Sequence, residues 1–130
     1  MTTVLLVDDE KLVLRSLEKT LLRAGYEVLT ATDCPSGSQV FAENIGQVDI
    51  AILDLNMPDF QGQSRPGSGL DLLADLKKQK PALPVVILTA YDEVNKAKDS
   101  VSGGASAFFV KGREQGLVEL IETILADRQE

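Results

Sequence analysis

The chain has 130 residues, the length of one domain, and its 44% hydrophobic and 25% charged residues exclude a disordered chain. Its apolar runs are far shorter than the ~20 residues of a membrane-spanning helix. A formal net charge of −7 disfavours contact with nucleic acid or anionic lipid, and the lack of histidine removes the commonest transition-metal ligand and the usual general base at neutral pH.

Strands and helices are predicted to alternate along the chain. Short apolar runs rich in branched side chains predict strands at 3–7, 26–31, 48–53, 85–88 and 107–110. Apolar residues at helical spacing predict helices at 11–24, 35–44, 70–79, 92–102 and 114–127. Most strands are too continuously apolar to face water, whereas 26–31 alternates enough for an edge strand. We therefore expect one α/β domain over residues 1–130, with a doubly wound, flavodoxin-like parallel sheet of five strands in the order 2-1-3-4-5 and helices on both faces.

Two of the helices carry specific predictions of burial. The apolar side of the helix at 11–24 is expected to comprise Val13, Leu14, Leu17, Leu21 and Leu22. The helix at 92–102 is thinly apolar, and its inward-facing residues are expected to be Val94, Ala97 and Val101. A helix that buries so little should be among the more mobile elements.

Polar residues stand at one end of four predicted strands. The first strand leads into Asp8, Asp9 and Glu10, the third ends at Asp54, the fourth at Thr89 and the fifth at Lys111. Because a parallel sheet aligns these ends, we expect the side chains to meet. Three carboxylates repel one another by roughly 4 kcal/mol per pair at 4 Å and an effective dielectric near 20, and Lys111 offsets one charge. A divalent cation that prefers oxygen ligands, Mg²⁺ or Mn²⁺, is therefore expected at this edge.

The same side chains predict phosphoryl chemistry. Asp9 and Asp54 would hold the metal, and Asp8 would act through a bound water. One oxygen of Asp54 would stay free to attack phosphorus and form an aspartyl phosphate. The metal and Lys111 would then stabilise the charge on the phosphoryl oxygens during transfer.

Two residues after the fourth strand would assist this transfer. The Thr89 hydroxyl would donate to a phosphoryl oxygen, and the small Ala90 would leave room for the phosphodonor. Taken singly, each polar residue also fits a structural role: an acidic pair can cap a helix, an aspartate or threonine can end a strand, and a lysine can be a solvated charge. Their joint position at four strand ends on one edge favours a functional site.

The chain resembles the receiver domain of two-component response regulators over essentially its whole length. The matching motifs are Val4-Leu5-Leu6-Val7-Asp8-Asp9-Glu10, Asp54-Leu55-Asn56-Met57-Pro58, Leu88-Thr89-Ala90, Gly104-Ala105 and Phe108-Phe109-Val110-Lys111. The resemblance implies a phosphorylation-dependent switch of a phosphorelay, in which Asp54 accepts a phosphoryl group from a histidine kinase or histidine phosphotransferase. It also implies Mg²⁺ bound by Asp9, Asp54 and the main-chain carbonyl of Asn56.

The resemblance further implies how the switch is transmitted. Thr89 and Phe108 would change position together on phosphorylation, although Phe108 could instead be a core aromatic with no further role. The change would remodel the face formed by 92–102, 107–110 and 114–127, where receivers bind outputs or form homodimers.

Two features depart from the family pattern. Gly112 follows Lys111 where the family usually has proline, often with a cis peptide bond. A cis peptide bond before a residue other than proline costs ~2.5–4 kcal/mol. We expect Lys111 still to reach the site, because it ends its strand.

The second departure is an insertion. Gly62 has the usual glycine spacing after Pro58, yet helix-like sequence begins only at Gly69, which indicates an insertion of about seven residues near the mouth of the site. The insertion is either a solvated extension or a contact that selects the partner or shields the phosphate.

Other functions fit these residues less well. A Mg²⁺-dependent hydrolase with an aspartate nucleophile generally has an acid two residues later, where this chain has Asn56, so no enzymatic activity is expected beyond self-phosphorylation and self-dephosphorylation. A degenerate receiver that acts only as a docking module would not need the intact Asp54 and Lys111. Flavin binding is disfavoured because Asp8 and Asp9 would repel the flavin phosphate.

The expected partners are a histidine kinase or phosphotransferase and a second copy of the chain, without direct contact to nucleic acid or membrane. The single Cys34 and an N-terminus without a basic region predict a cytoplasmic protein that has no signal peptide. The chain ends within or just after its last helix, so a stand-alone receiver and a fragment cut before a linker are both open.

Overall fold

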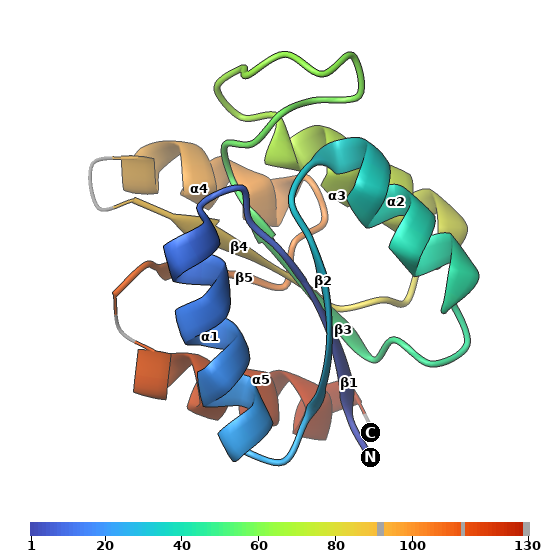
Figure 1. Ribbon diagram of the computed structural model, residues 1–130, viewed down its shortest axis with the longest axis vertical. Helices are drawn as coiled ribbons and strands as arrows, with labels where there is room; N and C mark the ends of the chain where they lie inside the picture. Colours follow the sequence, from blue (N-terminus) through green and yellow to red (C-terminus); the bar gives the residue numbers. More distant parts are fainter. Residues whose placement is uncertain (91–92, 113, 129–130) are drawn as a thin grey trace.

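The computed structural model describes residues 1–90, 93–112 and 114–128. Its five parallel strands form one sheet in the order β2-β1-β3-β4-β5 (Figure 1). The strands are β1 Thr3–Val7, β2 Glu27–Ala31, β3 Ile50–Asp54, β4 Val85–Thr89 and β5 Ala107–Val110. The helices are α1 Lys11–Arg23, α2 Cys34–Glu43, α3 Gly69–Gln79, α4 Val94–Ser102 and α5 Glu114–Arg128. The predicted fold class and strand order are confirmed.

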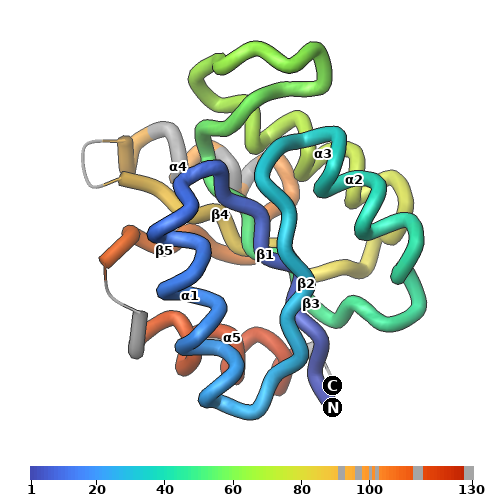
Figure 2. Tube along the Cα trace, in the orientation of Figure 1, coloured from blue at the N-terminus to red at the C-terminus, as the bar shows by residue number. Residues whose placement is uncertain are grey.

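Each face of the sheet has its own apolar core, because successive strand residues point to opposite sides. In β1, Leu5 and Val7 join the core under α2 and α3, whereas Val4 and Leu6 join the core under α1 and α5. Figure 2 shows α1 and α5 together on one side of the sheet, with α2 and α3 on the other. Every residue of β1, β3 and β4 is buried, which is why these strands read as continuous apolar runs.

Two strands extend one residue further than their apolar runs indicated. Asp54 is the last residue of β3 and pairs with Leu88, and Thr89 is the last residue of β4 and pairs with Val110. The ladder hydrogen bonds therefore fix the backbone of both residues at the carboxyl edge of the sheet.

Some burial predictions are wrong. Leu22 is 53% exposed because it stands one position after the buried Leu21, which turns it about 100° away from the apolar stripe of α1. Val101, in the last turn of α4, is 45% exposed rather than inward-facing, and Val94 is half-buried. The side chain of Ala97 lies outside the described residues. The edge position predicted for β2 is confirmed.

The predicted insertion forms a loop beyond the carboxyl edge of the sheet, between β3 and α3 (Figure 1). The loop ends at Gly69, where an added Cβ would lie 2.1 Å from the carbonyl oxygen of Asp54. The start of α3 can approach the end of β3 this closely because Gly69 has no side chain. Within the described chain, no helix is long and apolar enough to cross a membrane.

Candidate functional site

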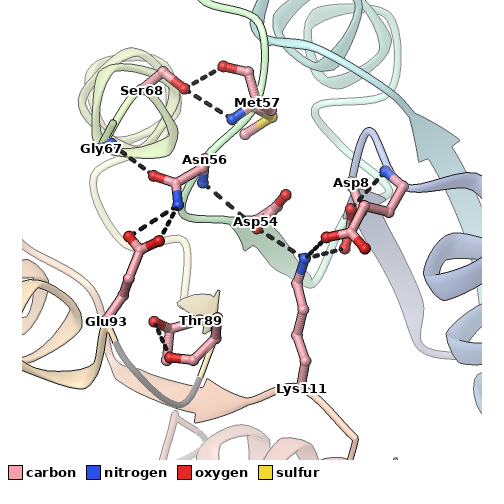
Figure 3. A network of polar contacts seen from close by, with 11 residues as sticks. Asp8, Asp54, Asn56, Met57, Gly67, Ser68, Thr89, Glu93 and Lys111 are labelled. Atoms are coloured by element: carbon pink, nitrogen blue, oxygen red, sulfur yellow. Dashed lines mark hydrogen bonds and ion pairs between the residues drawn. The ribbon is translucent and has the colours of Figure 1, made fainter. Parts of the chain in front are cut away.

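Lys111 joins the carboxylates at the carboxyl ends of β1 and β3 (Figure 3). Its Nζ lies 3.2 Å from Asp8 Oδ2 and 3.1 Å from Asp54 Oδ1. It also lies 2.9 Å from Glu10 Oε1, and no separate role was predicted for Glu10. The predicted meeting of Asp8, Asp54 and Lys111 is therefore present, although these residues are far apart in the chain.

Burial makes this cluster electrostatically unusual. Asp8 is fully buried, and Asp54 is 4% exposed. Burial, and then the charge of Asp8, raise the pKa of Asp54 to about 8, although Lys111 and the backbone N–H of Asn56 act in the opposite direction. Burial also raises the pKa of Asp8, against the hydrogen bond from the Glu10 backbone and the charge of Lys111.

The pKa of Lys111 responds to the same neighbours. Burial alone would lower it, but the hydrogen bond to Glu10 and the charges of Asp54 and Asp8 outweigh burial, so the pKa of Lys111 is raised. Lys111 therefore keeps its positive charge, and this one ammonium group faces three carboxyl groups.

The donor atoms at this edge fit a hard divalent cation. Oxygens of Asp8, Glu10 and Asp54 lie within 4.8 Å of one another. Asp8 Oδ2 is buried and accepts no hydrogen bond within the described residues. It forms an ion pair with Lys111. An all-oxygen set with surplus negative charge suits Mg²⁺ or Mn²⁺.

Asp9 does not belong to this three-carboxylate group. Its exposed side chain lines a neighbouring cavity of about 360 Å³ together with Asn56, Arg65 and Glu93. The Asp9 ligand role stays a prediction, as does that of the Asn56 carbonyl. Glu10, rather than Asp9, lies near Lys111. This could not be predicted, because a run of acidic residues after a strand does not indicate which side chain turns inward.

The predicted switch residues lie in or beside the core. Thr89 is fully buried, and its hydroxyl donates to the carbonyl of Ala90 at 3.1 Å rather than towards Asp54 (Figure 3). Ala90 is exposed at the edge of the sheet. Phe108 is partly buried and packs against the core under α2 and α3. Their roles in switching stay predictions.

The Lys111–Gly112 peptide is trans, since the described residues contain no cis bond. Gly112 has φ +98°, a conformation that side-chain-bearing residues rarely adopt, so glycine provides the turn after β5. Lys111 reaches Asp54 with this turn, as expected from its position at the end of the strand.

Asn56 connects the site to two other segments (Figure 3). Its Oδ1 accepts the backbone N–H of Gly67 at 2.8 Å, and its Nδ2 donates to both carboxylate oxygens of Glu93 at 2.9 Å. Its backbone N–H donates to Asp54 Oδ1 at 3.4 Å. Sequence reasoning missed Glu93, because nothing in the local pattern around it indicates a contact 37 positions away.

The inserted loop is an ordered structure organised by Asp59, which is 3% exposed. Asp59 Oδ1 accepts the backbone N–H groups of Gln61 and Gln63 at 2.9 and 3.0 Å, and Oδ2 pairs with Arg65 at 3.3 Å. These hydrogen bonds hold the pKa of Asp59 below its usual value. Ser68 closes the loop, since its hydroxyl hydrogen-bonds the backbone of Met57.

Comparison with known proteins gives the family. The family described as "Response regulator receiver domain" matches residues 4–123. The chain belongs to this family. Phosphorylation-dependent switching is the general function of receiver domains, which work with histidine kinases.

Curated relatives of this receiver domain include transcriptional regulators. The chain is 35% identical over 108 residues to the alginate biosynthesis transcriptional regulatory protein AlgB of Pseudomonas aeruginosa, covering 83% of the chain and 22% of AlgB. It is 34% identical over 122 residues to the transcriptional regulatory protein KdpE of Mycobacterium tuberculosis, covering 92% of the chain and 50% of KdpE. The chain thus spans from about a fifth to half of the length of these relatives.

Solved structures agree with the receiver fold. A response regulator receiver domain protein from Clostridium thermocellum superposes with a TM-score of 0.88 and 30% identity, covering 99% of this chain and 98% of the other. The receiver domain of NtrX from Brucella abortus superposes with a TM-score of 0.81 and 29% identity, covering 95% and 98% of the two chains.

Proposed function

We propose that Asp54 is the phosphoacceptor of this receiver domain and takes a phosphoryl group from a phosphohistidine of a histidine kinase or phosphotransferase. The observation that carries the proposal is the bridge from Lys111 Nζ to both Asp8 and Asp54 at the carboxyl edge of the sheet. Both contacts of the Asp54 carboxylate fall on Oδ1, so within the described residues Oδ2 has no hydrogen bond or ion pair that would have to break before it attacks.

In this reaction, Asp54 Oδ2 forms a bond to phosphorus while the bond from phosphorus to the donor nitrogen breaks and the nitrogen keeps the electron pair. Lys111 already lies beside Asp54 and would pair with the phosphoryl oxygens as charge develops on them. Thr89 would turn its hydroxyl from Ala90 to a phosphoryl oxygen, with Phe108 moving in the same step.

A magnesium ion would be held by Asp9, Asp54 and the main-chain carbonyl of Asn56, with Asp8 acting through water. When bound, it would offset the carboxylate charge and stabilise the phosphoryl oxygens. The raised pKa of Asp54 supports this requirement, because a nearby cation favours the ionised carboxylate that the attack needs.

We also propose the partners and limits of this activity. The face of α4, β5 and α5 would change on phosphorylation and bind an output or a second copy of the chain. The chain itself is expected to make no direct contact with nucleic acid, since its net charge is −7. Catalysis would stop at self-phosphorylation and self-dephosphorylation, because the Asn56 amide cannot exchange a proton as a general acid or base.

The test is incubation with acetyl phosphate and Mg²⁺ followed by intact mass. We expect the wild type to gain one phosphoryl group, which hydroxylamine removes, and Asp54→Asn to gain none. Asp75→Asn is the matched control, because Asp75 lies on α3 and pairs with Ser38 and Gln79 instead. A wild type that gains no mass would leave a docking module without phosphotransfer, and an Asp54→Asn variant that gains as much would place the phosphoacceptor at another residue.

A further inference from the structure

Asn56 links the end of the inserted loop to the residue that precedes α4. Its Oδ1 accepts from Gly67 at the end of the inserted loop, and its Nδ2 donates to Glu93 immediately before α4. The orientation of the amide is fixed by chemistry, because a backbone N–H can only donate and a carboxylate can only accept. The side chain next to the phosphoacceptor strand is therefore fully engaged in positioning other elements.

None of the α4 side chains that the structure describes is buried. Among its described side chains, Val94 is half-buried and Asn95, Lys98, Asp99 and Val101 are exposed. Helix α3, in contrast, buries Leu72, Leu73 and Leu76. With none of its described side chains buried, α4 depends on polar contacts at its start, so the hydrogen bond from Asn56 to Glu93 helps to position the beginning of the helix.

Asp54 and Glu93 share Asn56 as a hydrogen-bond partner. The Asp54 carboxylate accepts the backbone N–H of Asn56, and the Glu93 carboxylate accepts the side-chain N–H₂ of the same residue. At ionic strengths of 0.1–0.15 M, screening acts over roughly 8–10 Å, so a negative charge placed on Asp54 acts on a carboxylate that is bound to the same asparagine. A phosphoryl group on Asp54 adds negative charge to this pair.

We propose that Glu93 is a positioning residue that Asn56 holds in the unphosphorylated protein and that a phosphoryl group on Asp54 releases by charge repulsion, freeing the start of α4. This inference rests on the proposed function for its second half. The first half, the holding of α4 by Asn56 and Glu93, concerns the unphosphorylated protein alone and can be tested without a phosphodonor.

The holding contact is tested by amide hydrogen exchange of residues 94–102 in the unphosphorylated protein. Glu93→Asp keeps a negative charge at the start of the helix, which favours the helix dipole, but is one methylene too short for the contact with Asn56. We expect it to raise the exchange rates about tenfold, as for loss of a partly exposed hydrogen bond to a charged group. Exchange as slow as in the wild type would show that the contact does not hold α4.

The release is tested by adding Mg²⁺ and beryllofluoride as a phosphoryl mimic. The wild type should then exchange about tenfold faster over 94–102. Glu93→Gln keeps the length and one acceptor for Asn56 but carries no charge, so it should exchange slowly both before and after addition. Asp99→Asn, which removes the same charge from an exposed position on the same helix, should behave as the wild type.

Two outcomes separate the inference from the function on which it rests. If Glu93→Gln opens with beryllofluoride as readily as the wild type, charge repulsion is not the release, even though Asp54 accepts phosphoryl groups. If the wild type gains no phosphoryl mass from acetyl phosphate, the proposed function and the release both fail, while the Glu93→Asp comparison still decides whether Glu93 holds α4.

Discussion

Lys111 shows at the scale of one residue how this site balances its charges. One ammonium contacts Asp8, Glu10 and Asp54, and two of these three carboxylates are buried. Burial of a carboxylate is costly unless a partner offsets it, and a single lysine cannot offset three. Asp54 and Asp8 are therefore weaker acids than usual, with raised pKa values. We therefore expect this cluster to destabilise the fold until a divalent cation binds.

The raised pKa of Asp54 makes stability depend on pH. The folded protein keeps the Asp54 proton up to about pH 8, whereas an unfolded aspartate releases it near pH 4. Between these values the unfolded state binds fewer protons, so the free energy of unfolding falls as pH rises, by up to about 1.4 kcal/mol per pH unit. Asparagine does not titrate. In the presence of chelator, Asp54→Asn should be more stable than the wild type by about 1–3 kcal/mol at pH 8 and by much less at pH 5.

Urea unfolding at both pH values measures this difference. Asp75→Asn serves as the control for an aspartate-to-asparagine change outside the site, and it should not produce a gap that grows with pH. If the stability difference between the wild type and Asp54→Asn is the same at pH 5 and pH 8, the pKa of Asp54 is not raised in the folded protein.

At the scale of one element, the inserted loop owes its shape to a buried carboxylate rather than to apolar packing. Asp59 accepts two backbone N–H groups and pairs with Arg65, which in turn pairs with Asp71 on α3. Pro58 and Ser64 form an isolated antiparallel bridge across the base of the loop. The glycine-rich sequence correctly predicted a surface loop. It could not predict the hydrogen bonds, because these depend on which short polar side chain turns inward.

We expect Asp59→Ala to open this loop without unfolding the domain. Loss of several hydrogen bonds worth about 1 kcal/mol each should raise the population of open loop at least tenfold. Cleavage of the Phe60–Gln61 bond by chymotrypsin, which tracks that population, should accelerate by the same factor, while the thermal midpoint changes little. Gln63→Ala is the matched control, since it keeps the backbone N–H that Asp59 accepts. Equal cleavage rates in both variants would contradict the role of Asp59.

The predicted and observed helices and strands show what a sequence pattern can predict. Strands buried on both faces were identified from their apolar runs, and helices from their spacing. The apolar runs stop one residue before the ends of β3 and β4, and the expected polar end residues Asp54 and Thr89 still pair in the sheet. The predicted burial of Leu22 and Val101 was wrong, because hydrophobicity alone does not indicate which side of a helix faces the core. Gly69 was found only as the start of helix-like sequence, since its close approach to Asp54 is a tertiary fact.

At the scale of the whole molecule, parallel topology brings the functional residues together. β1, β3 and β5 end at the same edge, so Asp8, Asp54 and Lys111 become neighbours across more than a hundred positions of sequence. This meeting could be predicted, because it follows from strand order alone. The roles of Glu10 and Glu93 could not, since they depend on side-chain directions and on how the loop and α4 return to the site.

The same topology predicts that Mg²⁺ stabilises the entire domain, because its proposed ligands come from the ends of both β1 and β3. A ligand that binds the folded state at 100 times its Kd raises the free energy of unfolding by about 2.7 kcal/mol. Urea unfolding in saturating MgCl₂, compared with NaCl of equal ionic strength, should show an increase of this order.

Asp9→Asn should abolish most of this increase in the free energy of unfolding, because Asp9 and Asn56 line the same cavity. Glu10→Gln removes the same charge one residue later and should keep the increase, because Glu10 is exposed and its contact is with Lys111. The reverse result, with stabilisation lost in Glu10→Gln and kept in Asp9→Asn, would make Glu10 the ligand in place of Asp9, in line with its position among the three clustered carboxylates.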